Sequence, residues 1–436
     1  MTEYGLILAG GGAKGSYQIG VWKALREMDV KICAVAGTSV GAINGAMIVQ
    51  GDYDTAYKIW NEIDYNVIFN FALFDTEERA KMTIQDKVDY ILDLIRKRGL
   101  DTHALRTLLS KYISEEKVRK SDIYYGLTTF SLTDMKPEVK YIDEIPEGQL
   151  IDYIMASAAF PLFQDHIIND KHYLDGGVYD NMPVSVLADK GIKDLIAVDL
   201  SAIGRVRKVD TSGLNITYIR NSQFPGRILQ FQKRLVPVNI KVGHLDCLKA
   251  FNKVRGIRYY LTYQDNDFSD ICCLPSKEEY EQLLKGLDIT DRPGHPDRLI
   301  LYRMIRRLKK YTEDDMDEKA GFIAAMEITA DVLRVDRLKV YTLKSLVDTI
   351  LKKYKELKND TSDKHPVKEI SRILWDMNTL GFRTEEIKNV INPYFYFKGI
   401  QERSGRHKIL ITGYPDLCIA NIFIYLLLWR KHEITE

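Results

Sequence analysis

Two glycine-rich turns within the first 45 residues constrain the fold of this 436-residue chain more than any other feature. Residues 4–9 (YGLILA) predict a buried strand, which leads into residues 10–15 (GGGAKG) and then a segment with helical spacing. A second predicted strand, residues 31–36, leads to residues 37–41 (GTSVG) and another helix. We therefore expect two adjacent strand–turn–helix units, one with a glycine loop and one with a serine on its turn.

Each of these turns suits one part of an acyl-transfer site. Gly37 and Gly41 allow a tight strand-to-helix turn, and this turn exposes the hydroxyl of Ser39 at the carboxyl edge of the sheet. The glycine loop can direct free N–H groups toward one point, which stabilisation of a tetrahedral oxyanion requires. The two turns together predict acyl transfer on an ester.

Other interpretations of the same residues remain open. Gly10, Gly12 and Gly15 satisfy the dinucleotide-binding fingerprint, so a dinucleotide-binding oxidoreductase is an alternative. That fingerprint expects an acidic residue about 20 positions further on, at the end of the second strand. Residues 36–38 (AGT) occupy this place, and the acid Asp29 precedes the strand, which weakens the nucleotide interpretation. A non-catalytic binding module that retains only the fold is a third hypothesis.

Charge and cysteine content limit the expected partners. The formal net charge of +1 argues against a dedicated nucleic-acid binder, because phosphate contacts need a concentrated basic surface. The five cysteines show no metal-ligand spacing, so we expect no metal. We expect no cofactor either. Their odd number, and an N-terminus without a basic targeting segment, favour a reducing, cytoplasmic location.

The remaining sequence continues this alternation and then changes character. Strands are expected at residues 123–132, 139–142 and 194–200, helices at 149–158 and 183–190, and a hairpin at 166–174. This pattern predicts an α/β fold with a mostly parallel central sheet flanked by helices. Helical periodicity then recurs at residues 278–287, 297–311, 320–333, 343–357, 366–380 and 415–429. We therefore expect a catalytic domain at 1–275 and a helical C-terminal domain of unknown role at 276–436.

Four blocks of this sequence, in this order, resemble the patatin-like phospholipases. They are residues 10–15 (GGGAKG), 37–41 (GTSVG), 157–161 (SAAFP), and 175–177 (DGG) followed by Asn181-x-Pro183. The resemblance extends less sharply to about residue 275, and the region beyond it matches nothing assignable. It implies a lipid acyl hydrolase of the phospholipase A type, with a lipid or phospholipid as its substrate.

The resemblance also implies roles for individual residues. Ser39 would be the nucleophile and Asp175 the general base of a serine–aspartate dyad. The oxyanion hole would be formed by backbone N–H groups of Gly10, Gly11 and Gly12. Lys14 would help to orient this loop, and further glycines would support the turns: Gly37, Gly41, Gly176 and Gly177.

A histidine base is the alternative to Asp175. An unperturbed carboxylate, with a pKa of about 4, is a poor base unless it is close to the hydroxyl and partly desolvated. His166 and His172 both lie within ten residues of Asp175, and His172 would be the base of a triad. Histidines on a short hairpin are more often structural or exposed, and the resemblance favours the dyad.

The sequence also suggests how the protein reaches a lipid. Residues 419–429 form its most apolar run, but a membrane-spanning helix needs about 20 apolar residues. We therefore expect a buried helix there rather than an interfacial anchor. Basic segments at residues 303–310 and 352–355 can attract the protein weakly to anionic headgroups. A mostly cytoplasmic protein with peripheral membrane contact is expected, and the sequence indicates no oligomeric state.

Overall fold

The computed structural model describes residues 2–63, 101–161, 163–164, 166–202, 204–223, 226, 230–268, 276–286, 289–312, 316–359 and 415–430. The chain divides into two compact units, Met1–Asn252 and Lys253–Glu436. The change in sequence pattern predicted a boundary at residue 275 instead. In the structure, β9 (Tyr260–Thr262) pairs in parallel with β10 (Val340–Thr342), so the segment just before residue 275 pairs with a strand of the second unit.

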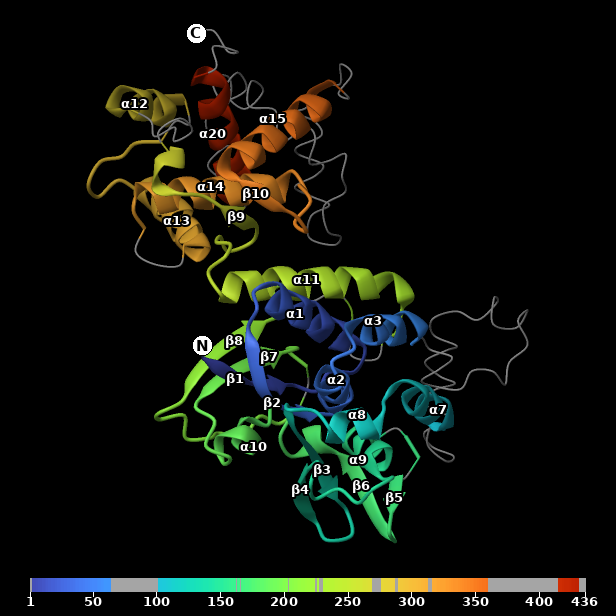
Figure 1. Cartoon of the computed structure of the whole chain (residues 1–436). Coiled ribbons are helices and arrows are strands. Elements are labelled where there is room, and N and C mark those ends of the chain that lie inside the picture. The colour runs from blue at the N-terminus through green and yellow to red at the C-terminus, as the bar shows by residue number, and fades with distance from the viewer. Residues whose placement is uncertain are drawn as a thin grey trace. The chain divides into compact units, whose positions relative to one another are not determined.

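The first unit is built on a sheet with the strand order β5-β6-β3-β2-β1-β7-β8 and with β4 beside β3 (Figure 1). The neighbours β3, β2, β1, β7 and β8 are parallel, whereas β4, β5 and β6 join through antiparallel pairs. These observations confirm the expected α/β fold. The strands are β1 Glu3–Leu8, β2 Lys31–Thr38, β3 Tyr124–Ser131, β4 Lys136–Tyr141, β5 His166–Ile168, β6 Lys171–Asp175, β7 Asp194–Asp199 and β8 Asn215–Arg220.

Helices cover both faces of this sheet. Successive side chains of a strand point to opposite faces, and Leu6, Ile7 and Leu8 of β1 are all completely buried. In Figure 1, α1 and α11 lie along one face and α10 lies on the other. The helices of this unit are α1 Ser16–Glu27, α2 Val40–Val49, α3 Tyr53–Glu62, α7 His103–Tyr112, α8 Glu115–Arg119, α9 Leu150–Ser157, α10 Val184–Ala188 and α11 Val236–Ala250.

The pairing of β3 brings together the ends of two strands that are far apart in sequence. Strand β4 pairs with β3 from Gly126 to Ser131, so β2 and β6 share the other edge of β3. Thr38 at the end of β2 pairs with Thr128, and Asp175 at the end of β6 pairs with Thr129. Because Thr128 and Thr129 are consecutive, the carboxyl ends of β2 and β6 meet there.

The second unit is mainly helical, and helices predicted from periodicity are confirmed in it. The packing of α14 against α20 brings together apolar side chains of both helices, including Phe322 and Phe423. Ile424 is completely buried, so the expectation of a buried helix at residues 419–429 is confirmed. The predicted helix at 366–380 lies outside the described residues. The described helices are α12 Lys277–Gly286, α13 Arg298–Leu308, α14 Glu318–Val332, α15 Leu343–Asn359 and α20 Pro415–Arg430.

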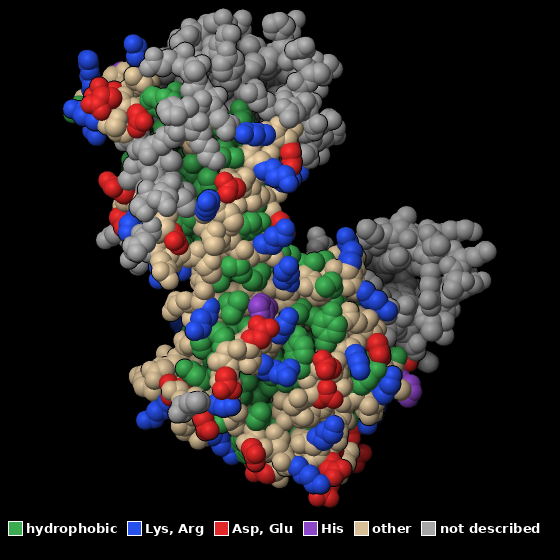
Figure 2. Space-filling view, turned by 45° about the horizontal axis from the view of Figure 1, so that its top comes forward, with side chains coloured by type: hydrophobic (Ala, Val, Ile, Leu, Met, Phe, Trp, Pro, Cys, Tyr) green, Lys and Arg blue, Asp and Glu red, His purple; other side chains and the backbone are tan. Residues whose placement is uncertain are grey.

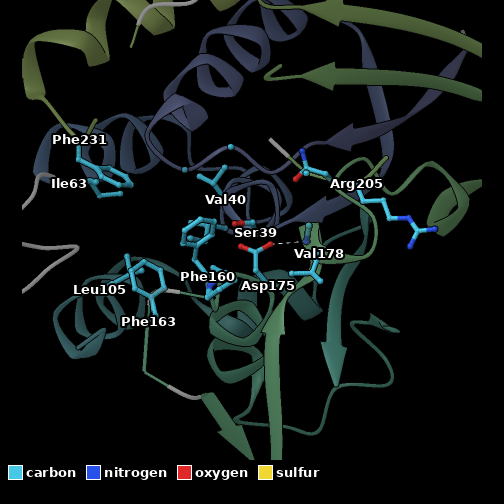
Figure 3. Close-up of a pocket in the computed structure, with 18 of the residues that line it drawn as sticks. Ser39, Val40, Ile63, Leu105, Phe160, Phe163, Asp175, Val178, Arg205 and Phe231 are labelled. Atoms are coloured by element: carbon cyan, nitrogen blue, oxygen red, sulfur yellow. Dashed lines mark hydrogen bonds between the residues drawn. The ribbon is translucent and has the colours of Figure 1, made fainter. Parts of the chain in front are cut away.

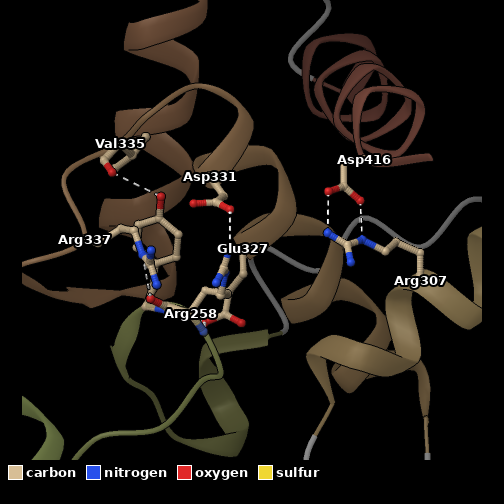
Figure 4. Close-up of polar contacts among 8 residues, drawn as sticks. Arg258, Arg307, Glu327, Asp331, Val335, Arg337 and Asp416 are labelled. Carbon is tan, nitrogen blue, oxygen red and sulfur yellow. Dashed lines mark hydrogen bonds and ion pairs between the residues drawn. The ribbon is translucent and has the colours of Figure 1, made fainter. Parts of the chain in front are cut away.

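Helix α14 also binds the segment that enters the second unit. The buried carboxylate of Glu327 accepts hydrogen bonds from the backbone N–H groups of Ile257, Arg258 and Tyr259, at 2.9–3.2 Å. Arg258 pairs with Asp331 at 3.0 Å, one helical turn further along α14 (Figure 4). These contacts satisfy a charge that would be costly to bury alone. Among the described helices, none is long and apolar enough to cross a membrane.

Candidate functional site

Ser39 lies on a strained turn between β2 and α2. Its φ of 57° is unusual for a residue other than glycine, and such strain is typical of a nucleophile elbow. A Cβ atom on Gly37 would lie 2.2 Å from the carbonyl oxygen of Gly41, so only glycine fits there. The backbone N–H of Ser39 donates to Ser157 Oγ at 3.0 Å, and this hydroxyl donates to the Thr128 carbonyl at 2.7 Å. The SAAFP block therefore braces the turn.

Asp175 faces Ser39 from the end of β6 (Figure 3). Its side chain is only 5% exposed, and its Oδ1 accepts a hydrogen bond from the Gly177 N–H at 2.7 Å. Burial raises the pKa of Asp175 to about 6, although hydrogen bonds from the Ser39 side chain and the Gly177 backbone oppose this rise. The carboxyl group is therefore close to a hydroxyl and partly desolvated, which is the condition that a carboxylate base needs.

The three glycines predicted for the oxyanion hole occupy different places. Gly11 and Gly12 line the same pocket as Ser39 and Asp175. The N–H of Gly10 instead donates to the Asn181 carbonyl at 3.1 Å, and Asn181 Nδ2 donates back to the Gly10 carbonyl at 3.2 Å. Gly10 thus anchors the loop, and its N–H is already occupied. The sequence contained Asn181 in a recognisable block but gave no sign of this role.

Lys14 is buried beneath the glycine loop rather than exposed in the pocket. Its Nζ donates to the carbonyls of Leu200 at 3.3 Å and Ser201 at 3.2 Å, just beyond β7. Desolvation lowers the pKa of Lys14, and the charge of Asp199 partly offsets that effect. These bonds connect the loop to the end of a neighbouring strand, which agrees with the orienting role that the resemblance implies.

A buried network of amide side chains supports both turns, and no local sequence pattern indicates it. Gln18 Nε2 donates to the Ala9 carbonyl at 2.7 Å, directly before the glycine loop. Asn44, on the helix that follows Ser39, donates to Gln18 Oε1 at 2.7 Å and to the Gly15 carbonyl at 2.9 Å. Trp60 Nε1 donates to Asn44 Oδ1 at 2.9 Å. Because every link is buried, the network fixes the glycine loop, α2 and the pocket wall in one arrangement.

The pocket around Ser39 has a volume of about 400 Å³ and a mainly apolar lining. In Figure 3 most of the labelled apolar side chains lie on one side of Ser39, whereas Val178 and Arg205 lie on the other side. Such an asymmetric pocket can hold a hydrocarbon chain on one side and a polar group on the other. The labelled residues on the apolar side are Val40, Ile63, Leu105, Phe160, Phe163 and Phe231.

The histidines considered as an alternative base do not line this pocket. His166 pairs with Tyr173 in the β5–β6 hairpin, and burial lowers its pKa. The backbone of His172 is bonded to the segment that follows β3, through its N–H to Thr133 Oγ1 at 2.9 Å. Within the described parts of the chain, no group of three or more His, Cys, Asp or Glu residues could hold a metal ion.

Comparison with known proteins places residues 6–188 under the family model described as patatin-like phospholipase. Patatin-like phospholipase domain-containing protein 7 of Rattus norvegicus is 23% identical over 68% of this chain and 21% of its own length. Lysophospholipase NTE1 of Yarrowia lipolytica is 26% identical over 48% of this chain and 13% of its own length. The chain thus spans about a fifth or less of these relatives.

Two solved structures align with most of this chain. VipD from Legionella pneumophila aligns with 96% of this chain and 90% of its own, at 15% identity and a TM-score of 0.32. The type III effector protein ExoU aligns with 96% of this chain and 77% of its own, at 13% identity and the same TM-score of 0.32.

Proposed function

Because residues 6–188 form a patatin-like phospholipase domain, we propose that this protein is a lipid acyl hydrolase that acts through a Ser39–Asp175 dyad. The observation that carries the proposal is the contact between the strained Ser39 and the buried Asp175 in the wall of a mainly apolar pocket. The substrate class is a fatty acyl ester of a phospholipid or a related lipid.

The proposed reaction follows from the positions of these groups. Ser39 Oγ attacks the ester carbonyl carbon while its proton passes to Asp175. The developing oxyanion is stabilised by the backbone N–H groups of Gly11 and Gly12, with Gly10 anchoring the loop rather than donating. The ester C–O bond then breaks, and Asp175 returns the proton to the leaving alcohol. Water then attacks the acyl carbon while Asp175 takes its proton. The bond between that carbon and Ser39 Oγ breaks, Asp175 returns the proton to Ser39 Oγ, and the fatty acid is released.

The alternative functions are less well supported by the same site. The oxidoreductase hypothesis needs an acid at the end of β2, where the hydroxyl of Thr38 is bonded to the Asp180 carbonyl at 2.9 Å. A non-catalytic module would not need a buried carboxyl group against Ser39. A fluorophosphonate probe distinguishes these hypotheses, because only an activated serine reacts with it covalently. Stoichiometric labelling, followed by turnover on a panel of lipid esters, would support the hydrolase; an unlabelled folded protein would overturn it.

The raised pKa of Asp175 predicts the pH dependence of hydrolysis. A base must be deprotonated to accept the serine proton, so kcat/KM should rise with pH and level off above about 6. Well below that pH, each further unit should cost about tenfold, because the ionised fraction falls in that proportion. The measurement is the pH profile of kcat/KM on a water-soluble ester without an ionisable group. Ionisation of the substrate then does not contribute to the profile. A profile that is flat from pH 5 to pH 8 would contradict the assigned base.

The apolar side of the pocket should set the length of the acyl chain. Leu105 lies on α7 at this side, so Leu105→Trp should fill space that a long chain occupies. Hydrolysis of a butanoyl ester should change little. Hydrolysis of a hexadecanoyl ester should fall roughly tenfold or more. If the tryptophan excludes two methylene groups of the chain from the pocket, about 1.6 kcal/mol of favourable burial energy is lost. Leu108→Trp, on the same helix but outside the pocket, is the matched control; equal losses on both esters would contradict the assignment.

The remaining proposals concern partners and location. We infer that the lipid substrate is met at a membrane surface and that the contact is peripheral. A mostly cytoplasmic location remains a prediction from the cysteine content.

A further inference from the structure

Helix α13 of the second unit carries an unusual surface. Elsewhere, on the face shown in Figure 2, basic and acidic side chains are interspersed. Residues 298–311 (RLILYRMIRRLKKY) contain six basic residues and no acidic one. Three large apolar side chains of the same helix are exposed to solvent: Leu299 at 57%, Tyr302 at 59% and Ile305 at 43%.

The opposite face of α13 is already held by the core of its own unit. Ile300 is buried in a cluster with Cys418 and Leu426 of α20. Arg307 pairs with Asp416 at the start of α20 (Figure 4). These contacts with α20 hold α13 in place. The outer face of α13 is not needed to complete the hydrophobic core of the unit.

The outer face combines apolar and unpaired basic groups. Leu299, Tyr302 and Ile305 recur every three residues, which keeps them on one side of a helix. Exposed Arg306 follows on the same side, as do Lys309 and Lys310 of the short 3-10 helix (Lys309–Tyr311) that continues α13. None of the three has an ion-pair partner in the described part of the chain. Long basic side chains can extend beyond neighbouring apolar groups and place their charges in a polar layer above them.

We propose that this outer face of α13 is a docking surface for a membrane that contains anionic lipids. Leu299, Tyr302 and Ile305 would enter the boundary between headgroups and acyl chains, while Arg306, Lys309 and Lys310 pair with lipid phosphates or carboxylates. A helix lying in the plane of the interface, with apolar residues on its buried side and basic residues along its edges, has the composition required. The inference deepens the proposed peripheral membrane contact and does not depend on the catalytic residues.

Helix α15 shows why basic charge alone is not enough. It carries the other basic segment noted in the sequence, residues 352–355, and Lys353 there pairs with Glu356 at 3.8 Å. Its large apolar residues Leu346, Ile350 and Tyr354 are buried. It therefore offers charge without apolar groups to insert, and it provides a matched control.

The test measures binding of the full chain to sedimented vesicles made of phosphatidylcholine with about 30% phosphatidylserine, and of phosphatidylcholine alone. Three triple variants are compared with the wild-type protein. The apolar set is Leu299→Ser, Tyr302→Ser and Ile305→Ser; the charge set is Arg306→Glu, Lys309→Glu and Lys310→Glu; the control set is Lys344→Glu, Lys352→Glu and Lys353→Glu. The charge and control sets change the net charge equally.

Each lysine or arginine near an anionic surface contributes about fivefold to binding, so loss of three of them should weaken binding to the anionic vesicles roughly a hundredfold. The charge set also adds three negative charges, so its loss should be at least that large. The apolar set should lose at least about tenfold, because three side chains no longer enter the interface. The control set should lose only a few-fold through the change in net charge. All variants should hydrolyse a water-soluble ester as the wild-type protein does, so a failure of docking is distinguishable from a failure of catalysis.

Three results would overturn the proposal. Equal losses in the charge and control sets would mean that only net charge matters. Unchanged binding of the apolar set would mean that α13 does not insert. The third result is that the wild-type protein fails to bind anionic vesicles but binds an acidic polypeptide, such as polyaspartate, through α13. This result would assign the surface to a protein partner instead.

Discussion

Replacing Ser39 by alanine should lower ester hydrolysis at least about 10⁴-fold and abolish labelling by a fluorophosphonate probe. The fold should be unaffected. Alanine keeps the Cβ atom, so the turn with its φ of 57° meets no new strain. The backbone N–H of residue 39 can still donate to Ser157 Oγ, so the hydrogen bond that braces the turn also remains. Binding of lipid in the pocket should therefore persist without turnover.

Ser16 provides a matched control for this change. It follows the glycine loop, it is completely buried, and its hydroxyl has no hydrogen-bond partner among the described residues. Ser16→Ala therefore removes an identical atom near the site without touching the pocket, and activity should be retained. The measurement is the set of kinetic constants of Ser39→Ala and Ser16→Ala on one water-soluble ester. More than a tenth of wild-type activity in Ser39→Ala would mean that another residue attacks the ester.

Local patterns predicted much of the first unit because they coincide with its tertiary structure. The apolar run before the glycine loop became β1, whose residues are buried on both faces, and the Asn169–Asp170 turn joins β5 to β6 with positive φ at both positions. Such signals depend on neighbours in sequence. The shared edge of β3 was not predictable in this way, since it depends on which strands pair over a long separation.

Polar contacts inside the protein were the least predictable part of the candidate site. Gln18 and Asn44 lie in helical segments where an amide usually faces solvent, and nothing local shows that both are buried against the glycine loop. Gly10 was assigned to the oxyanion hole with its neighbours, but its N–H is bonded to Asn181, far away in sequence. Likewise Glu327 interrupts an apolar helix and binds backbone N–H groups that only the folded chain brings near.

Asp175→Asn should be almost as damaging to hydrolysis as the loss of Ser39. Asparagine preserves the shape and can still accept the Gly177 N–H, but it cannot accept the serine proton. His166→Ala and His172→Ala should retain most activity, because neither side chain lines the pocket. The measurement is kcat/KM for the three variants at pH 8. The reverse order of losses would establish a histidine base.

The stability of Asp175→Asn separates a lost proton acceptor from a damaged fold. The pKa of Asp175 is about 6 in the folded protein and about 4 in the unfolded chain, so ionisation opposes folding. Below about pH 4 both states are protonated and this cost is absent; it grows as pH rises and is complete above about pH 6. Two pKa units correspond to about 3 kcal/mol.

Asparagine does not ionise, so calorimetry should find the inactive variant more stable than the wild-type protein at pH 8, with the difference shrinking toward pH 4. If the variant were less stable than the wild-type protein at pH 8, its inactivity would be explained by a damaged fold.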